Sequence, residues 1–69
     1  MEERDPRKQP WVGDRLAKDG KERVIKRMDG GQIIYSVRSE KMPHVAQVRE
    51  CWITTWQAWA RNADVIERV

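Results

Sequence analysis

The sequence has a single cysteine and a single histidine among its 69 residues. One cysteine cannot form an internal disulfide, so the disulfide framework of small secreted domains is excluded. A structural zinc site uses four Cys or His ligands, and the one cysteine and one histidine of this chain cannot supply them within one subunit. We therefore expect neither a metal nor a cofactor.

Long apolar stretches are also missing. No run approaches the roughly 20 apolar residues that a membrane-spanning helix needs. Residues 1–10 lack the apolar centre of a signal peptide. Together with the lack of disulfides, these features predict a cytoplasmic protein that does not associate with membranes.

The residues needed for catalysis are scarce. Nucleophilic catalysis pairs a serine or cysteine with a nearby base, and the only candidate pair is His44 with Cys51. In a helix these two residues would lie two turns apart, too far for a hydrogen bond. We interpret Cys51 as a small buried hydrophobic residue and His44 as a loop residue. Calcium-loop and phosphate-loop motifs are absent, so we predict no catalytic residues, no small-molecule substrate and no enzymatic activity.

Positive charge is concentrated in the first half of the chain. The net charge is +3, and the whole excess falls within residues 11–41 because acidic and basic residues balance on either side. A basic stretch suits an anionic partner such as nucleic acid, whereas the alternative is that the charges solubilise strand faces. The candidate phosphate contacts are Arg15, Lys18, Lys21, Arg23, Lys26, Arg27, Arg38 and Lys41.

Three of the four tryptophans lie within residues 48–60. A buried aromatic side chain removes about 150–250 Å² from water, so this stretch is expected to organise the core. The predicted core is Leu16, Val24, Ile25, Ile33, Tyr35, Val37, Trp52, Trp56, Trp59 and Ile66. Tryptophan is also enriched at binding hot spots. The candidate interaction aromatics are Trp11, Tyr35 and Trp59, and burial of Trp59 in a homodimer is one way to use them.

Turn signals divide the chain into short segments. Pro6 and Pro10 interrupt a polar stretch, so residues 1–10 are predicted to be a disordered tail before a single domain of residues 11–69. Asp19-Gly20 and Asp29-Gly30-Gly31 separate three candidate strands within residues 12–38. In the last of these, polar and apolar residues alternate. We predict a three-stranded antiparallel meander.

Residues 44–62 fit two templates. In the first, residues 48–53 form a fourth strand after a loop at residues 39–43, a short helix runs from residue 54 or 55 to about residue 61, and residues 63–66 form a last strand. In the second, apolar residues spaced three and four apart, from Val45 to Ala63, form one long amphipathic helix on a three-stranded sheet, an α+β fold. The β-branched run Ile53-Thr54-Thr55 favours the first template.

The favoured order resembles the SH3-like small barrel, a mainly β fold of about five strands with a short helix near the C-terminus. The segments Val12-Gly13-Asp14, Arg23-Val24-Ile25, Gly30-Gly31 with Ile33-Ile34-Tyr35, and residues 55–60 are similar to those of small barrel proteins carried by bacteriophages and mobile elements. The resemblance covers residues 11–67, although residues 40–50 are longer than a tight barrel loop needs.

These observations lead to two functional hypotheses. The first is a non-catalytic protein-interaction module, an adaptor or inhibitor, whose partner is an unknown protein or a second copy of the chain. The alternative is a basic accessory protein that binds the nucleic-acid backbone through residues 15–41.

Overall fold

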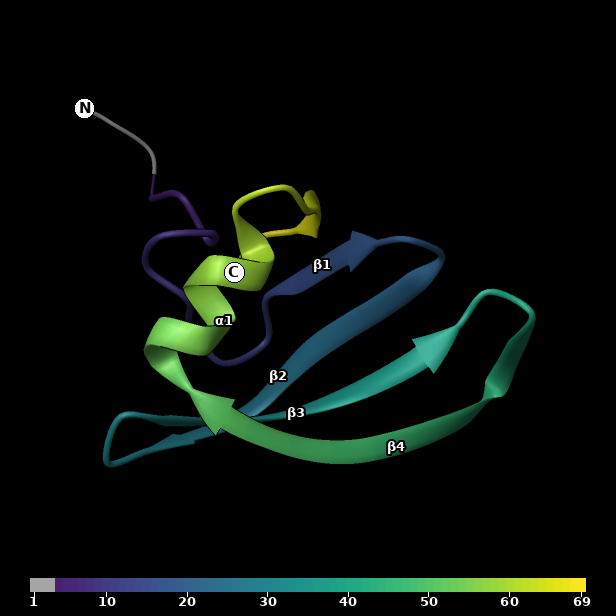
Figure 1. Ribbon diagram of the computed structural model, residues 1–69, viewed down its shortest axis with the longest axis horizontal. Helices are drawn as coiled ribbons and strands as arrows, with labels where there is room; N and C mark the ends of the chain where they lie inside the picture. The colour runs from purple at the N-terminus through teal and green to yellow at the C-terminus, as the bar shows by residue number, and fades with distance from the viewer. Residues whose placement is uncertain (1–3) are drawn as a thin grey trace.

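The computed structural model describes residues 4–69 and consists of one five-stranded antiparallel sheet and one short helix (Figure 1). The elements are β1 (Arg15–Lys18), β2 (Lys21–Asp29), β3 (Gln32–Ser39), β4 (Met42–Trp52), α1 (Ile53–Ala60) and β5 (Asp64–Glu67). The strand order in the sheet is β4-β3-β2-β1-β5. The prediction of a mainly β fold with a short helix near the C-terminus is confirmed, and the α+β alternative with one long helix is wrong.

Two-residue turns set the register of the meander. Asp19 and Gly20 join β1 to β2 with φ angles of 54° and 76°, and Gly30 and Gly31 join β2 to β3 with φ angles of 56° and 84°. Positive φ at both central residues is the pattern of the type I′ turn, whose twist matches that of paired strands. Glycine adopts this conformation without steric cost. The predicted meander is therefore confirmed.

Strand β4 is longer than the sequence predicted. It begins at Met42 instead of near residue 48, so the predicted loop shrinks to a turn at residues 40–41, and His44, predicted in a loop, lies in the strand. The pairing with β3 shifts between Arg38, opposite Ala46, and Ser39, opposite Met42. This irregularity on an edge strand accommodates Pro43, which has no N–H to donate.

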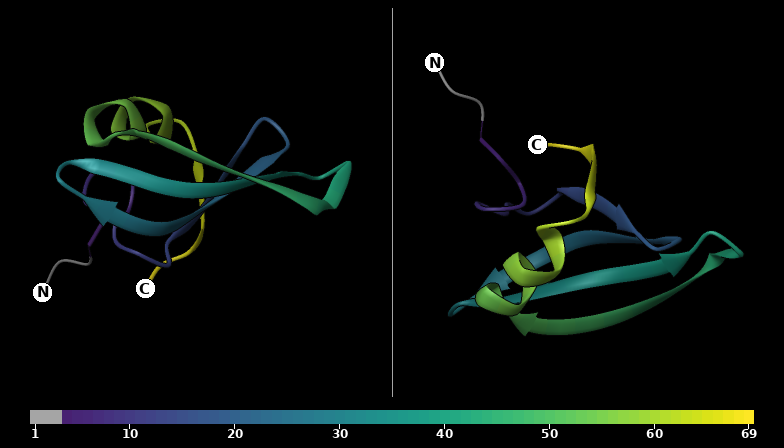
Figure 2. Two further views of the ribbon diagram at one scale, coloured as in Figure 1. Left: turned by 90° about the horizontal axis from the view of Figure 1, so that it is seen from below. Right: turned by 45° about the horizontal axis from the view of Figure 1, so that its top comes forward.

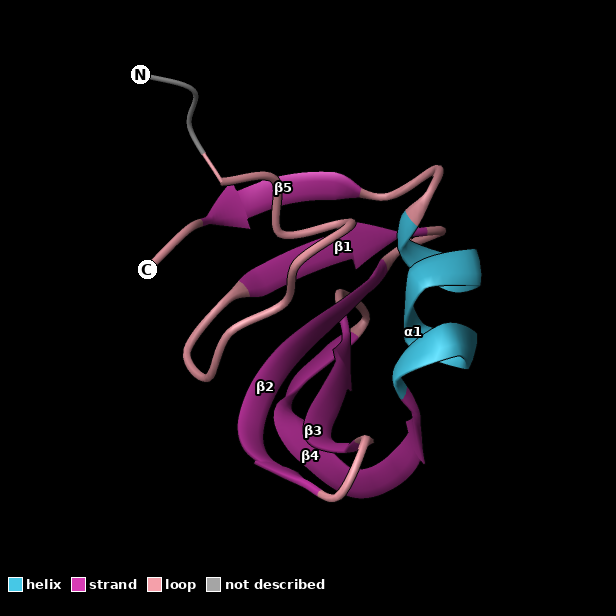
Figure 3. Cartoon of the chain, turned by 90° about the vertical axis from the view of Figure 1, so that its left-hand side faces the viewer, coloured by secondary structure: helices cyan, strands magenta, loops and turns pink. Residues whose placement is uncertain are grey.

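Helix α1 connects the two edges of the sheet. The backbone N–H of Ile53 donates to the carbonyl of Gly31 at 2.8 Å, which ties the start of α1 to the β2–β3 turn. Strands β2, β3 and β4 curve beneath α1 (Figure 3). A bulge at Lys26, between Ile25 and Arg27, increases the bend of β2.

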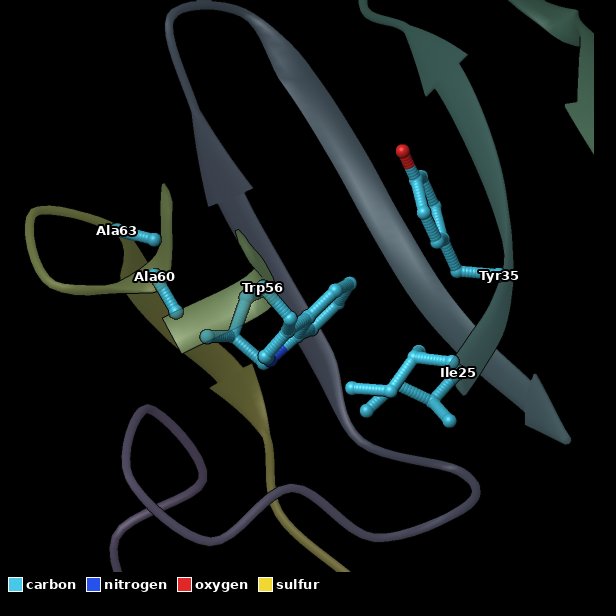
Figure 4. Close-up of a cluster of buried hydrophobic side chains, with 7 residues drawn as sticks. Ile25, Tyr35, Trp56, Ala60 and Ala63 are labelled. Carbon is cyan, nitrogen blue, oxygen red and sulfur yellow. The ribbon is translucent and has the colours of Figure 1, made fainter. Parts of the chain in front are cut away.

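The hydrophobic core lies between α1 and the inner face of the sheet, which we define as the face carrying Leu16, Ile25, Ile33 and Tyr35. The Trp56 side chain projects from α1 toward Ile25 and Tyr35 (Figure 4). The buried apolar residues are Leu16, Ile25, Ile33, Tyr35, Trp56, Ala60 and Ala63, with Val37 and Trp59 packed against them.

Three predicted core residues lie outside this cluster. Trp52 and Ile66 are 57% and 54% exposed because they belong to the edge strands, and Val24 lies on the outer face of the sheet. Ala60 and Ala63, which were not predicted, are buried members of the cluster.

Asp14 joins the two ends of the chain. Its fully buried carboxylate accepts hydrogen bonds from the Arg4 guanidinium at 2.7 and 2.8 Å, from the backbone N–H of Trp11 at 2.8 Å, and from that of Val69 at 3.0 Å. The first described residues accordingly lie near the C-terminus, on the same side of the molecule (Figure 2). Residues 1–3 of the predicted tail lie outside the described residues, and disorder of the free tail stays a prediction, although Arg4 makes these defined contacts.

We expect this junction to make stability depend on acid pH. Burial alone would raise the pKa of Asp14, but the hydrogen bonds from Arg4, Val69 and Trp11 outweigh it and hold the pKa below its usual value. The charged carboxylate therefore contributes stability that is complete above the unfolded pKa of about 3.9 and is lost as pH falls through the lower folded pKa. Urea unfolding between about pH 6 and pH 2 should show this loss, and an Asp14→Asn variant should show a flatter profile. An equally steep profile in that variant would contradict the assignment.

Candidate functional site

A groove of about 560 Å³ lies on the inner face of the sheet, beyond the part that α1 covers. Helix α1 lies over the end of the sheet where β4 finishes (Figure 1). The groove is formed at the other end, where β3 finishes and β4 starts. Its lining residues are Lys21, Arg23, Tyr35, Val37, Ser39, Met42, Val45, Gln47 and Arg49. Strand alternation puts these side chains together, because Val37 pairs with Arg23 on one side and Gln47 on the other.

Arg23 occupies the boundary between the groove and the core. The Cζ atom of its guanidinium lies 4.0 Å from the ring centroid of Trp59 and 4.6 Å from that of Tyr35. Both rings also contact Trp56, with centroid separations of 5.2 Å for Trp59 and 5.5 Å for Tyr35. The aromatic core thus holds the guanidinium in place through cation–π contacts.

The charge of Arg23 has no acidic counterpart in the part of the chain that the structure describes. Within residues 4–69, its guanidinium forms no ion pair with a carboxylate. Burial lowers the pKa of Arg23 and outweighs the opposite effects of Tyr35 and Cys51, while the nearby positive charge of Arg49 lowers the pKa slightly further. Lys21 and Arg49 also line the groove, and its described lining contains no aspartate or glutamate. An anionic group entering the groove would therefore relieve the repulsion among these cations.

The structure divides the predicted phosphate contacts between two faces. Lys21 and Arg23 line the groove, and Lys18 lies nearby on β1, where its ammonium donates to the Trp59 carbonyl at 3.4 Å. Arg15 is ion-paired on the outer face of the sheet, because its Nε donates to Glu22 at 2.8 Å and its guanidinium lies 3.4 Å from the Glu67 carboxylate. The remaining candidates line no part of the groove: Lys26, Arg27, Arg38 and Lys41. A single basic face spanning residues 15–41 is thus not formed, because successive strand residues point to opposite faces.

The three candidate aromatics also have different environments. Tyr35 is only 5% exposed, and its hydroxyl points away from Ile25 and Trp56 (Figure 4). Trp59 is half-buried beside Arg23. Trp11 is exposed, but it lies at the junction of the termini, where the Arg4 guanidinium stacks on its ring at 4.2 Å. Only Tyr35 and Trp59 therefore belong to the site.

Sequence reasoning missed the contribution of β4. Val45, Gln47 and Arg49 line the groove from the part of the chain that was assigned to a loop or left between two templates. Together with Cys51 they occupy every second position of the segment, and this period-two pattern could have identified them as one face of a strand. Because Val45 is the only strongly apolar member of the three, the hydrophobic signal of the alternation is weak.

His44 and Cys51 do not form a catalytic pair. Both lie in β4, where seven residues span about 23 Å and place the two side chains on opposite faces. Burial raises the pKa of the Cys51 thiol, partly offset by the nearby Arg23 charge. Across residues 4–69, no group of three or more His, Cys, Asp or Glu side chains is placed to hold a metal ion. No helix in this range has the length and apolar character to cross a membrane.

Comparison of the chain with protein-family models, with curated proteins and with solved structures finds no match. The function must therefore be argued from the groove itself.

Proposed function

We propose that this chain is a non-catalytic protein-interaction module whose inner-face groove binds an acidic, extended segment of a partner protein. The observation that carries the proposal is Arg23, a half-buried guanidinium that two aromatic rings hold in place without a carboxylate partner in the described chain. A guanidinium binds a carboxylate through two parallel N–H donors. Arg23 is therefore preorganised to receive an aspartate or glutamate side chain.

The apolar part of the groove favours a peptide over a nucleic acid. Val37, Met42 and Val45 form one side of the groove, and the latter two are about half exposed, at 53% and 43%. Apolar side chains of a peptide would remove this surface from water. Single-stranded nucleic acid needs open aromatic faces on which bases stack, whereas Tyr35 is buried and Arg23 lies against the rings of both Tyr35 and Trp59.

We also assign the fold to the SH3-like small barrels. The order β4-β3-β2-β1-β5 with a short helix between β4 and β5 supports this assignment, as does the curvature of β2, β3 and β4 (Figure 3). Such a scaffold places a groove between strand ends and loops without any catalytic group. The assignment concerns the scaffold, and the proposed binding depends on Arg23 and its neighbours.

An Arg23→Gln substitution should weaken binding of an acidic peptide at least about tenfold, because a hydrogen bond to a charged group contributes about 1.5–3 kcal/mol. The probe is a synthetic peptide that alternates glutamate with leucine, measured by isothermal titration calorimetry. Arg38→Gln is the matched control, since it removes the same charge from an exposed position of β3 outside the groove. It should leave the affinity within about twofold.

Three outcomes would contradict the proposal. Equal losses in both variants would show that only net charge matters. Failure of the wild-type chain to bind the peptide would remove the groove as a peptide site. Tighter, strongly salt-dependent binding of single-stranded DNA or RNA, lost in Arg23→Gln, would assign the groove to nucleic acid instead.

A further inference from the structure

Strand β4 is an edge of the sheet that is unusually long and open. It has 11 residues, and every one except Cys51 is exposed. The opposite edge, β5, has only four residues, of which Asp64 and Glu67 are charged. An edge strand presents unpaired backbone N–H and C=O groups that can pair with another strand, and lysine, proline and bulges are the usual features that block such pairing.

These blocking features are confined to one end of β4. Pro43 and the pairing irregularity both lie near its beginning, whereas residues 44–52 contain no proline and no lysine. The outer face of this part carries Val48, which is 73% exposed, and Trp52, which is 57% exposed. The regular part of β4 therefore combines free backbone groups with exposed apolar side chains.

We infer that β4 pairs antiparallel with β4 of a second copy of this chain, about a two-fold axis through Gln47. In a continuous sheet, residues directly opposite each other must lie on the same face, so the axis passes through a residue and not between two residues. With Gln47 at the axis, Ala46 faces Val48 and His44 faces Glu50 of the second copy. Val45 then faces Arg49.

The charge pattern selects this arrangement from its neighbours. An axis through Arg49 or Glu50 would place like charges directly opposite each other, which is destabilising. An axis through Val48 would place Glu50 opposite the methyl group of Ala46. An axis through Ala46 would place Glu50 opposite the apolar side chain of Met42. The axis through Gln47 gives Glu50 a hydrogen-bonding partner in His44 and places two neutral amides opposite each other. In this isologous arrangement the β4 edges of the two copies pair with each other, so the assembly closes as a dimer.

The dimer would bring two grooves together. Val45 and Arg49 line the groove of one copy and would lie opposite Arg49 and Val45 of the other. The inner face would then continue across the two-fold axis from one sheet to the next. The pairing itself depends on the β4 backbone and is independent of the proposed peptide binding.

Sedimentation equilibrium of the full chain from about 10 μM to about 1 mM tests the inference, since a small interface gives weak association. We expect a concentration-dependent dimer. Gln47→Lys places two ammonium groups opposite each other at the axis, so it should weaken the dimer at least about tenfold. Val48→Lys is the matched control on the same strand: it adds the same edge-blocking charge, but its lysine would face Ala46, so it should weaken the dimer much less than Gln47→Lys does.

Each contrary result is decisive. A wild-type chain that stays monomeric at about 1 mM would overturn the inference. If that monomer binds the acidic peptide, the proposed function still holds and the β4 edge is available for contacts with the partner protein. A dimer that Val48→Lys disrupts and Gln47→Lys does not would overturn the proposed axis. Circular dichroism of both variants should match the wild type, because both positions are exposed in the monomer.

Discussion

Replacement of Trp56 by alanine should strongly destabilise the fold at 25 °C. Trp56 is fully buried, and its side chain projects from α1 toward Ile25 and Tyr35 (Figure 4). Truncating a buried tryptophan to alanine costs about 3–5 kcal/mol, whereas a domain of this length has a total stability of only about 3–10 kcal/mol. Far-UV circular dichroism and urea unfolding would measure the loss.

Two further variants make this prediction specific. Trp52→Ala removes the same side chain from an exposed position, so it should change the free energy of unfolding by less than about 1 kcal/mol. Trp56→Phe should remain folded with a lower melting temperature. The Trp56 Nε1 atom is buried without a hydrogen-bond partner in the described chain, so phenylalanine loses volume but no hydrogen bond. A Trp56→Ala variant as stable as Trp52→Ala would contradict the assigned core.

An Asp14→Asn substitution should destabilise the protein by about 3 kcal/mol, because it leaves the Arg4 guanidinium without its charged partner. The asparagine side chain is similar in size but carries an NH₂ group, which cannot accept the hydrogen bonds that one carboxylate oxygen now receives. In a domain of this length, 1 kcal/mol corresponds to about 4–8 °C in melting temperature. A thermal melt at pH 7 should therefore shift down by at least about 12 °C.

Asp19→Asn is the matched control for Asp14→Asn. Asp19 is an exposed residue of the β1–β2 turn, where asparagine also tolerates a positive φ. Its substitution should change stability by no more than about 0.5 kcal/mol. Equal melting temperatures for the two variants would show that the buried ion pair does not hold the termini together.

The two glycine-containing turns were predictable because their signal is local. Asp19-Gly20 and Gly30-Gly31 adopt backbone angles that few other residue pairs accept, so the sequence itself specifies where the chain reverses. The run Ile53-Thr54-Thr55 was harder to read. Its β-branched residues correctly argued against one long helix, yet all three lie in α1, because Ile53 is anchored to the Gly31 carbonyl.

The groove was only half visible in the sequence. Lys21 and Arg23 were identified from their charge, but so were cations that the alternation of the strands directs elsewhere, such as Arg38. Arg49 was not identified, because it lies outside residues 11–41, which hold the excess of positive charge. The beginning of β4, around Pro43 and His44, has weak strand propensity. Its pairing with β3, a tertiary interaction, makes this segment a strand.

By itself, the amino-acid sequence determined the features that depend on neighbouring residues: the positions of two turns, the three strands of the meander and the contribution of the tryptophan-rich residues 48–60 to the core. Only the tertiary structure decided the features that depend on residues far apart in the chain. The Asp14 carboxylate joins Arg4 to Val69, and the stacking of Arg23 joins β2 to β3 and α1. The physical reason is that turn propensity acts within a few residues, whereas burial and the choice of sheet face are fixed only when distant strands pair.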